Sequence, residues 1–193
     1  MQNSMTDPTS QLIRRAQAND RDAFAALFAQ YKNLVYRTAY LMLDNPHDAE
    51  DALQEVFVLV HKSLTGFDPR KGAFTTWLHR ITINYCLNHR RKRSFISSPL
   101  DETLSNGEFP EAQSAEEDAI WQAVRGLSDK QQAVVVLRYY WDLSYAEVAQ
   151  ILEIPLGTVK SRLDLAIKTL RPVFEAEKSR AGTHPAVEVT HEL

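Results

Sequence analysis

Residues 144–171 limit the fold of this chain most, because two helical patterns follow each other there with a very short break. Ser144 followed three positions later by Glu147 is a capping box, which predicts the start of a helix. A second helix is predicted to begin near Pro155, because proline is tolerated in a first helical turn. Its apolar residues recur at helical spacing and predict one buried stripe: Val159, Leu163, Ala166, Ile167 and Leu170.

The opposite face of this second helix is mostly small or polar. At about 100° per residue it carries Gly157, Ser161, Leu165 and Lys168, with Lys160 and Arg162 on the flanks and Thr158 on one shoulder. A small residue, hydroxyls and flanking cations suit a helix-turn-helix whose second helix enters a DNA major groove. A helical hairpin in any α-bundle has the same spacing, so the rest of the chain must decide.

Charge is distributed unevenly along the 193 residues. The formal net charge of -3 argues mildly against a nucleic-acid binder, but this average hides separate blocks. Residues 79–93 hold five Arg or Lys and no acid, whereas residues 101–118 hold seven acids and residues 47–55 hold four, both without Arg or Lys. The total charge therefore does not exclude nucleic-acid binding.

The N-terminal part, residues 9–93, is predicted to form one helical domain. Its helices are expected over about residues 9–18, 20–43, 46–64 and 73–93. Asp20 is a good N-cap for the second helix, and Asp44, Asn45 and Pro46 break the chain before the third. Ile83 and Leu87 lie away from the core stripe of the fourth helix, so either another helix or a partner is expected to cover them.

Residues 94–115 have almost no apolar periodicity and many acids, which predicts a flexible linker. A helix resumes near Glu116, and a second capping box, Ser128 with Gln131, opens a helix that leads into the helix-turn-helix. Pro172 marks the predicted end of the last helix, so residues 116–174 form the second domain and residues 175–193 a disordered tail. The fold class is therefore all-α, with two helical domains joined by a flexible acidic linker.

Several classes of function receive no support from the residues. The single cysteine, Cys86, excludes an internal disulfide and a multi-cysteine metal site. We find no Ser/His/Asp array, no phosphate-cradling glycine loop and no cluster of metal ligands, so we expect no catalytic site, no metal and no cofactor. The first ten residues are polar, and no apolar run approaches the roughly 20 residues that a membrane span needs. These observations predict a cytoplasmic protein without membrane insertion.

Two long segments resemble the extracytoplasmic-function (group IV) sigma factors of bacterial RNA polymerase. The first reads DAEDALQEVFVLVHKSLTGFDPRKGAFTTWLHRITIN, and the second reads LSDKQQAVVVLRYYWDLSYAEVAQILEIPLGTVKSRL. The resemblance implies a subunit that binds core RNA polymerase and directs promoter recognition, −10 melting and transcription initiation. It also implies an anti-sigma factor as a partner, and Ile83 and Leu87 could contribute to the surface of this chain that binds it.

The resemblance also implies roles for particular residues. The acidic third helix would contact core polymerase through Asp48, Asp51, Gln54 and Glu55. The loop at residues 66–72 and the fourth helix would capture the melted −10 strand through Phe67, Thr76, Arg80, Asn84, Asn88 and Arg91, with Trp77 structural. The last helix would read the duplex −35 element through Thr158, Lys160, Ser161, Arg162, Leu165 and Lys168.

Three residues depart from the family pattern. Glu153 stands where members of the family usually have glycine, and Asn88 stands where many have aspartate. Many members also have an arginine near the position of Leu165. The promoter sequence therefore cannot be copied from relatives, and Glu153 is predicted to adopt a left-handed backbone conformation. The alternatives are a helix-turn-helix regulator of the two-component effector type, which would need an α/β domain, and a helical adaptor that binds no DNA.

Overall fold

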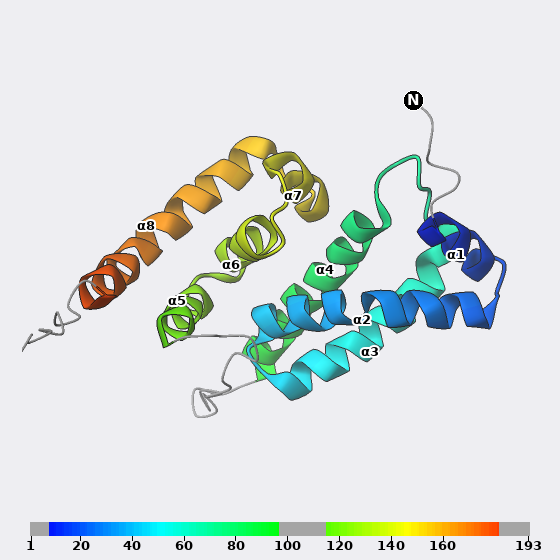
Figure 1. Ribbon diagram of the computed structural model, residues 1–193, viewed down its shortest axis with the longest axis horizontal. Coiled ribbons are helices and arrows are strands. Elements are labelled where there is room, and N and C mark those ends of the chain that lie inside the picture. Colours follow the sequence, from blue (N-terminus) through cyan, green and yellow to red (C-terminus); the bar gives the residue numbers. More distant parts are fainter. Residues whose placement is uncertain (1–7, 97–114, 182–193) are drawn as a thin grey trace, which may run out of the picture.

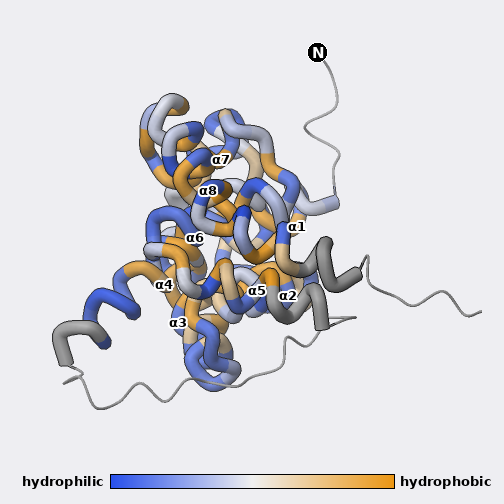
Figure 2. The backbone as a smooth tube through the Cα atoms, turned by 90° about the vertical axis from the view of Figure 1, so that its left-hand side faces the viewer, coloured by the Kyte–Doolittle hydropathy of each residue, from blue (hydrophilic) through white to orange (hydrophobic). Residues whose placement is uncertain are grey.

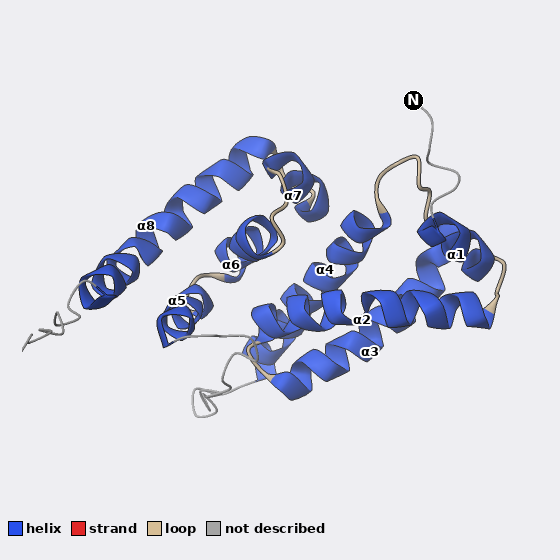
Figure 3. Ribbon diagram, in the orientation of Figure 1, coloured by secondary structure: helices blue, strands red, loops and turns tan. Residues whose placement is uncertain are grey.

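The computed structural model describes residues 8–96 and 115–181, and these residues form helices and loops without a strand (Figure 3). The N-terminal domain contains α1 (Pro8–Gln17), α2 (Arg21–Leu43), α3 (Pro46–Ser63), the short 3₁₀ helix η1 (Leu64–Gly66) and α4 (Phe74–Ile96). The C-terminal domain contains α5 (Ala115–Arg125), α6 (Asp129–Val135), the π-helix η2 (Val136–Tyr140), α7 (Tyr145–Leu152) and α8 (Leu156–Ala181). The all-α prediction is confirmed. The predicted linker falls almost wholly outside the described residues.

Local signals place several helix ends where the sequence predicts them. The Asp20 carboxylate accepts hydrogen bonds from the backbone N–H groups of Asp22 and Ala23 at the start of α2. Asp44 ends α2 in a left-handed conformation, with φ 55°, and the Asn45 side chain caps α3. In the second domain, the Ser144 N–H donates to the Glu147 carboxylate over 2.8 Å, so the capping box of α7 is formed.

Two expectations for the last helix are wrong. Helix α8 continues through Pro172 to Ala181, so the loss of one backbone hydrogen bond at this proline does not end it. Residues 175–181 are therefore helical rather than part of a disordered tail, and residues 182–193 lie outside the described residues. Ile167 is exposed, because it lies at the edge of a stripe whose other four members are buried: Val159, Leu163, Ala166 and Leu170.

The N-terminal domain has an aromatic core beneath the loop that joins α3 to α4. The Phe67 ring packs edge-on against Phe74, with centroids 5.4 Å apart, and is tilted against Trp77 at 5.2 Å. Tyr31 of α2 contacts Phe74 at 5.1 Å. Figure 2 shows hydrophobic and hydrophilic stretches alternating along the helices, as expected when one face of each helix is buried.

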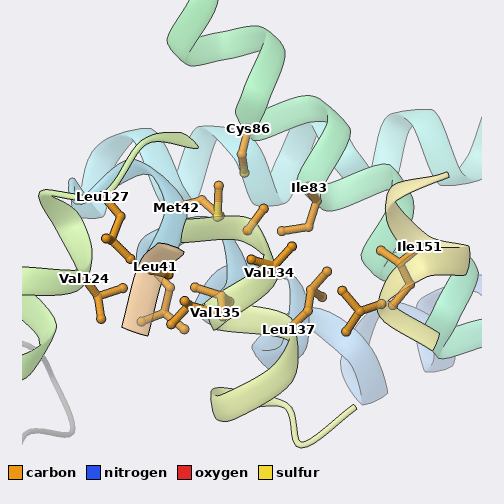
Figure 4. Packing of buried hydrophobic residues seen from close by; sticks show 14 of the residues in the cluster. Leu41, Met42, Ile83, Cys86, Val124, Leu127, Val134, Val135, Leu137 and Ile151 are labelled. Atoms are coloured by element: carbon orange, nitrogen blue, oxygen red, sulfur yellow. The ribbon is translucent and has the colours of Figure 1, made fainter. Parts of the chain in front are cut away.

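A second core joins the two domains. Helix α4 lies beside the C-terminal domain (Figure 1) and contacts α2, α3 and α7, while α2 also contacts α6 and η2. Ile83 and Cys86 of α4 are fully buried in a cluster with Val134, Leu137 and Ile151 (Figure 4). Burying an isoleucine contributes about 1.5–3 kcal/mol, so this contact favours a packed pair of domains. The chain's own second domain therefore covers Ile83, and Leu87 is partly buried against the same cluster.

Polar contacts at the end of α2 reinforce the packing of the two domains. Helix ends leave carbonyl groups without partners in their own helix. The carbonyl of Leu41 accepts a 2.6 Å hydrogen bond from the Gln132 amide, which comes from α6 in the other domain. Arg90 of α4 donates to the carbonyl of Met42 over 3.1 Å and to the Gln132 side chain. Gln132 therefore caps a helix of the first domain from the second.

Candidate nucleic-acid and polymerase interfaces

The segment between α3 and α4 forms a hollow of about 320 Å³, which we call the loop pocket. The Asp68 carboxylate stiffens its rim by accepting hydrogen bonds from the backbone and side chain of Arg70, which lower the pKa of Asp68 to about 2. The Lys71 N–H donates to the carbonyl of Asp68 over 3.0 Å. The pocket is lined by Gly66, Phe67, Asp68, Lys71, Gly72, Ala73, Thr76, Trp77, Arg80 and Gln150.

The candidate −10 residues lie in this pocket and along one face of α4. Thr76 and Arg80 line the pocket, and the face continues with exposed Asn84, Asn88 and Arg91 at intervals of three or four residues. Phe67 also lines the pocket, but its side chain is buried beneath the loop. Its ring is therefore placed to shape the pocket floor rather than to stand free. Trp77 packs in the same aromatic core.

The C-terminal domain reaches the same pocket. Gln150 of α7 lines it and donates to the carbonyl of Lys71 over 3.3 Å. Glu153, in the turn between α7 and α8, forms a 2.9 Å ion pair with Arg80. Sequence reasoning missed both contacts, because their partners are more than 70 positions apart.

The helix-turn-helix turn has the backbone that the sequence predicts. Glu153 has φ 53° and ψ 43°, which is the left-handed conformation that glycine adopts without a Cβ clash. The N–H groups of Glu153 and Ile154 both donate to the carbonyl of Ala149. This compact turn sets the direction in which α8 leaves α7.

The candidate −35 residues surround the exposed face of α8. Lys160, Ser161, Leu165 and Lys168 are exposed, whereas Thr158 and Arg162 are half-buried. The Ser161 hydroxyl donates to the carbonyl of Thr158 over 3.1 Å, so its oxygen can still accept a hydrogen bond from a ligand. The buried stripe on the opposite side of α8 keeps this face directed outward.

The candidate polymerase residues do not share one environment. Asp51, Gln54 and Glu55 are exposed on α3. Asp48 is half-buried and accepts a 2.8 Å hydrogen bond from Arg93, with the His89 ring 3.8 Å away. Beside the exposed residues is an apolar groove, which sequence reasoning did not identify. Its lining is Phe24, Phe28, Gln54, Phe57, Val58, His61 and Lys62.

Comparison with known proteins defines the class of this chain. Residues 27–96 match the family model described as Sigma-70 region 2, and residues 117–170 match Sigma-70, region 4. Each range falls within one of the two domains of the structure, so the chain has the two-domain organisation of sigma-70-type transcription factors. The alternative of a helix-turn-helix regulator of the two-component effector type is wrong, because both domains match sigma-70 regions and the described residues contain no strand of the α/β domain that such a regulator would need.

Individual relatives narrow the class to one family. The chain is 34% identical over 174 residues to the ECF RNA polymerase sigma factor SigW of Bacillus subtilis, an alignment that covers 82% of this chain and 92% of SigW. It is 29% identical to the RNA polymerase sigma-H factor of Pseudomonas aeruginosa, covering 85% of this chain and 94% of that protein. The chain belongs to the ECF sigma factors, and it acts with RNA polymerase in promoter recognition and transcription initiation.

A solved structure shows the same fold. The sigma factor RpoE, crystallised with the anti-sigma factor NepR from Bartonella quintana, superposes with a TM-score of 0.68. The match covers 79% of this chain and 96% of RpoE at 22% identity. Among the described helices of our chain, none has the length and apolar character required to span a membrane.

Proposed function

We propose that the loop pocket and α4 capture the melted −10 strand. Promoter opening requires a base to leave the duplex stack, and such a base needs a pocket beside a cationic track for the backbone. The observation that carries this proposal is the continuity of the loop pocket with one polar face of α4. Arg80 belongs to both, and Asn84, Asn88 and Arg91 extend the face. Phe67 and Thr76 contribute to the pocket itself.

The exposed face of α8 is proposed to read the duplex −35 element. Ser161, Leu165 and Lys168 lie opposite the buried stripe and face the major groove, where base edges are read. Lys160 and Arg162 lie on the flanks and contact phosphates, which position the helix without reading sequence. Thr158 lies in the first turn of α8, close to where the chain enters the groove.

Core polymerase is proposed to dock on the exposed acidic side of α3. Asp51 and Glu55 offer negative charge to a basic partner surface, and Gln54 joins them to the neighbouring apolar groove. An apolar centre with a charged rim is a common arrangement in protein interfaces. Because Asp48 already pairs with Arg93, we assign it a smaller share of this contact.

The remaining roles follow from membership of the family. The polymerase performs the chemistry, so this subunit has no catalytic function of its own, and it works in the cytoplasm with the polymerase. We also infer an anti-sigma factor as a partner, supported by the RpoE–NepR complex. In the packed arrangement of the two domains, Ile83 is buried and is not part of a surface for that partner.

Run-off transcription with core polymerase and promoter DNA tests the proposed function. We expect transcripts only when the chain is added, with Arg80→Ala reducing open-complex formation and Lys160→Ala weakening promoter binding. A regulator that acts through another sigma factor would need that factor in the mixture. An adaptor that binds no DNA would give no transcript with any promoter.

A further inference from the structure

The Gln17 side chain at the end of α1 forms hydrogen bonds with the backbone of the segment that builds the loop pocket. Gln17, the last residue of α1, donates from Nε2 to the carbonyl of Leu64 and to the carbonyl of Phe67, each over 2.9 Å. It is half-buried and lies 47 and 50 positions away from these partners. Gln17 also precedes residues 27–96, the part of the chain that matches Sigma-70 region 2.

The two carbonyls belong to the backbone that builds the pocket. Leu64 begins η1, and Phe67 directly follows this helix and lines the pocket. Phe67 closes the turn by donating its N–H to the carbonyl of Leu64 over 3.0 Å. A primary amide has two N–H donors, so Gln17 can contact both carbonyls and hold them at a set separation.

The surroundings of Gln17 keep its amide in place. Ile13 and Ala16 of α1 are buried in the same core as Leu64 and Phe67, so α1 is packed against η1. The turn after α1 is held by a 2.7 Å ion pair between Arg15 and Asp20. The end of α1 therefore presents the amide to the loop from a fixed position.

We propose that Gln17 is a positioning residue for −10 recognition. It sets the position of the Phe67 backbone, and through it the shape of the hollow that receives the captured base. Gln17 is absent from the pocket lining, so it acts through the loop rather than by touching DNA. This inference rests on the proposed role of the loop pocket.

Binding of the full chain to single-stranded −10 oligonucleotides, including a library with varied bases, tests the inference. Gln17→Leu keeps the approximate size of the side chain but removes both donors. We expect about a five- to tenfold loss of affinity and a weaker base preference, because two neutral hydrogen bonds are lost. The salt dependence should stay that of the wild type, since Gln17 contacts no phosphate. Gln17→Asn, one methylene shorter, should give an intermediate loss.

Two further variants show whether an effect of Gln17→Leu arises from the contact of Gln17 with the loop. Gln11→Leu is the matched control, because Gln11 is an exposed amide on the same helix, α1, and does not line the pocket. It should leave −10 binding unchanged. Arg80→Ala should lower affinity and also reduce the salt slope by about 0.7–1, as expected for one lost phosphate contact. If Arg80→Ala has no effect, the proposed role of the pocket fails, whatever Gln17→Leu does.

The inference itself is overturned if Arg80→Ala weakens −10 binding while Gln17→Leu and Gln17→Asn keep wild-type affinity and base preference. It is also overturned if Gln17→Leu lowers binding to −35 duplexes and to core polymerase as much as it lowers −10 binding. The substitution would then disturb the whole chain rather than the loop pocket. Circular dichroism is measured on each variant. If Gln17→Leu does not fold, Gln17→Asn decides: wild-type −10 binding by a folded Gln17→Asn overturns the inference.

Discussion

Substitutions of Glu153 can separate the cost of its left-handed backbone from the contribution of its ion pair with Arg80. Its backbone is left-handed at φ 53° and ψ 43°, and its side chain pairs with Arg80 of the other domain. A residue with a Cβ loses about 1 kcal/mol in this conformation relative to glycine. The ion pair is solvent-accessible, with side chains 38% and 65% exposed for Arg80 and Glu153, so it contributes between about 0 and 1 kcal/mol.

These magnitudes predict different outcomes for Glu153→Gly and Glu153→Gln. The glutamine variant loses only the ion pair, so its free energy of unfolding should fall by at most about 1 kcal/mol. The glycine variant loses the pair but also the backbone strain, so it should be about 1 kcal/mol more stable than the glutamine variant. Urea unfolding of the full chain measures both. In an Arg80→Ala background, Glu153→Gln should have no effect, whereas Glu153→Gly should still stabilise the chain.

The same variants test whether the ion pair competes with DNA. Glu153 holds the guanidinium that we assign to the −10 strand, so Glu153→Gln should raise affinity for a −10 oligonucleotide by up to about fivefold. Asp164→Asn, which removes an exposed acid from α8, is the matched control and should not change this affinity. A Glu153→Gly variant less stable than Glu153→Gln would refute the strain argument. Unchanged −10 affinity in Glu153→Gln would refute competition.

Three other predictions concern separate parts of the molecule. Burial against Trp141 lowers the pKa of His79 from 6.5 to about 4, so the unfolded chain takes up a proton that the folded chain does not. The free energy of unfolding should therefore fall by about 3 kcal/mol between pH 6.5 and pH 4, and His79→Phe should remove this part of the pH profile. Asp51→Arg should weaken binding to core polymerase, most strongly at low salt, without lowering the free energy of unfolding; wild-type affinity at both low and physiological salt would contradict it. Lys160→Ala should weaken all −35 sequences similarly and reduce the salt slope by about one, whereas Ser161→Ala should change the order of preferred sequences, as measured on a −35 library at several salt concentrations. The reverse pattern would show that α8 presents a different face to the groove.

Local chemistry alone determined most of the helix boundaries. The cap at Asp20, the break at Asp44 and the capping box at Ser144 depend on groups at most four positions apart, so a sequence pattern contains all the information they need. The left-handed turn at Glu153 was predicted differently, from the resemblance to a family that usually has glycine at this position. The end of α8 was not predictable, because a proline removes only one hydrogen bond and the rest of the helix decides whether it continues.

The tertiary structure decided which side chains are buried or paired and which remain available for DNA or protein partners. Helical periodicity places Ile83 on a face of α4 but does not say what covers that face, and only the packing of the two domains shows it to be the C-terminal domain. Arg80 and Asp48 read as exposed charges in the sequence, yet Glu153 and Arg93 pair with them from 73 and 45 positions away. Gln17 is an ordinary polar residue until the fold brings the carbonyls of the loop to its amide. Such contacts depend on how whole helices and domains pack, which no pattern spanning a few residues contains.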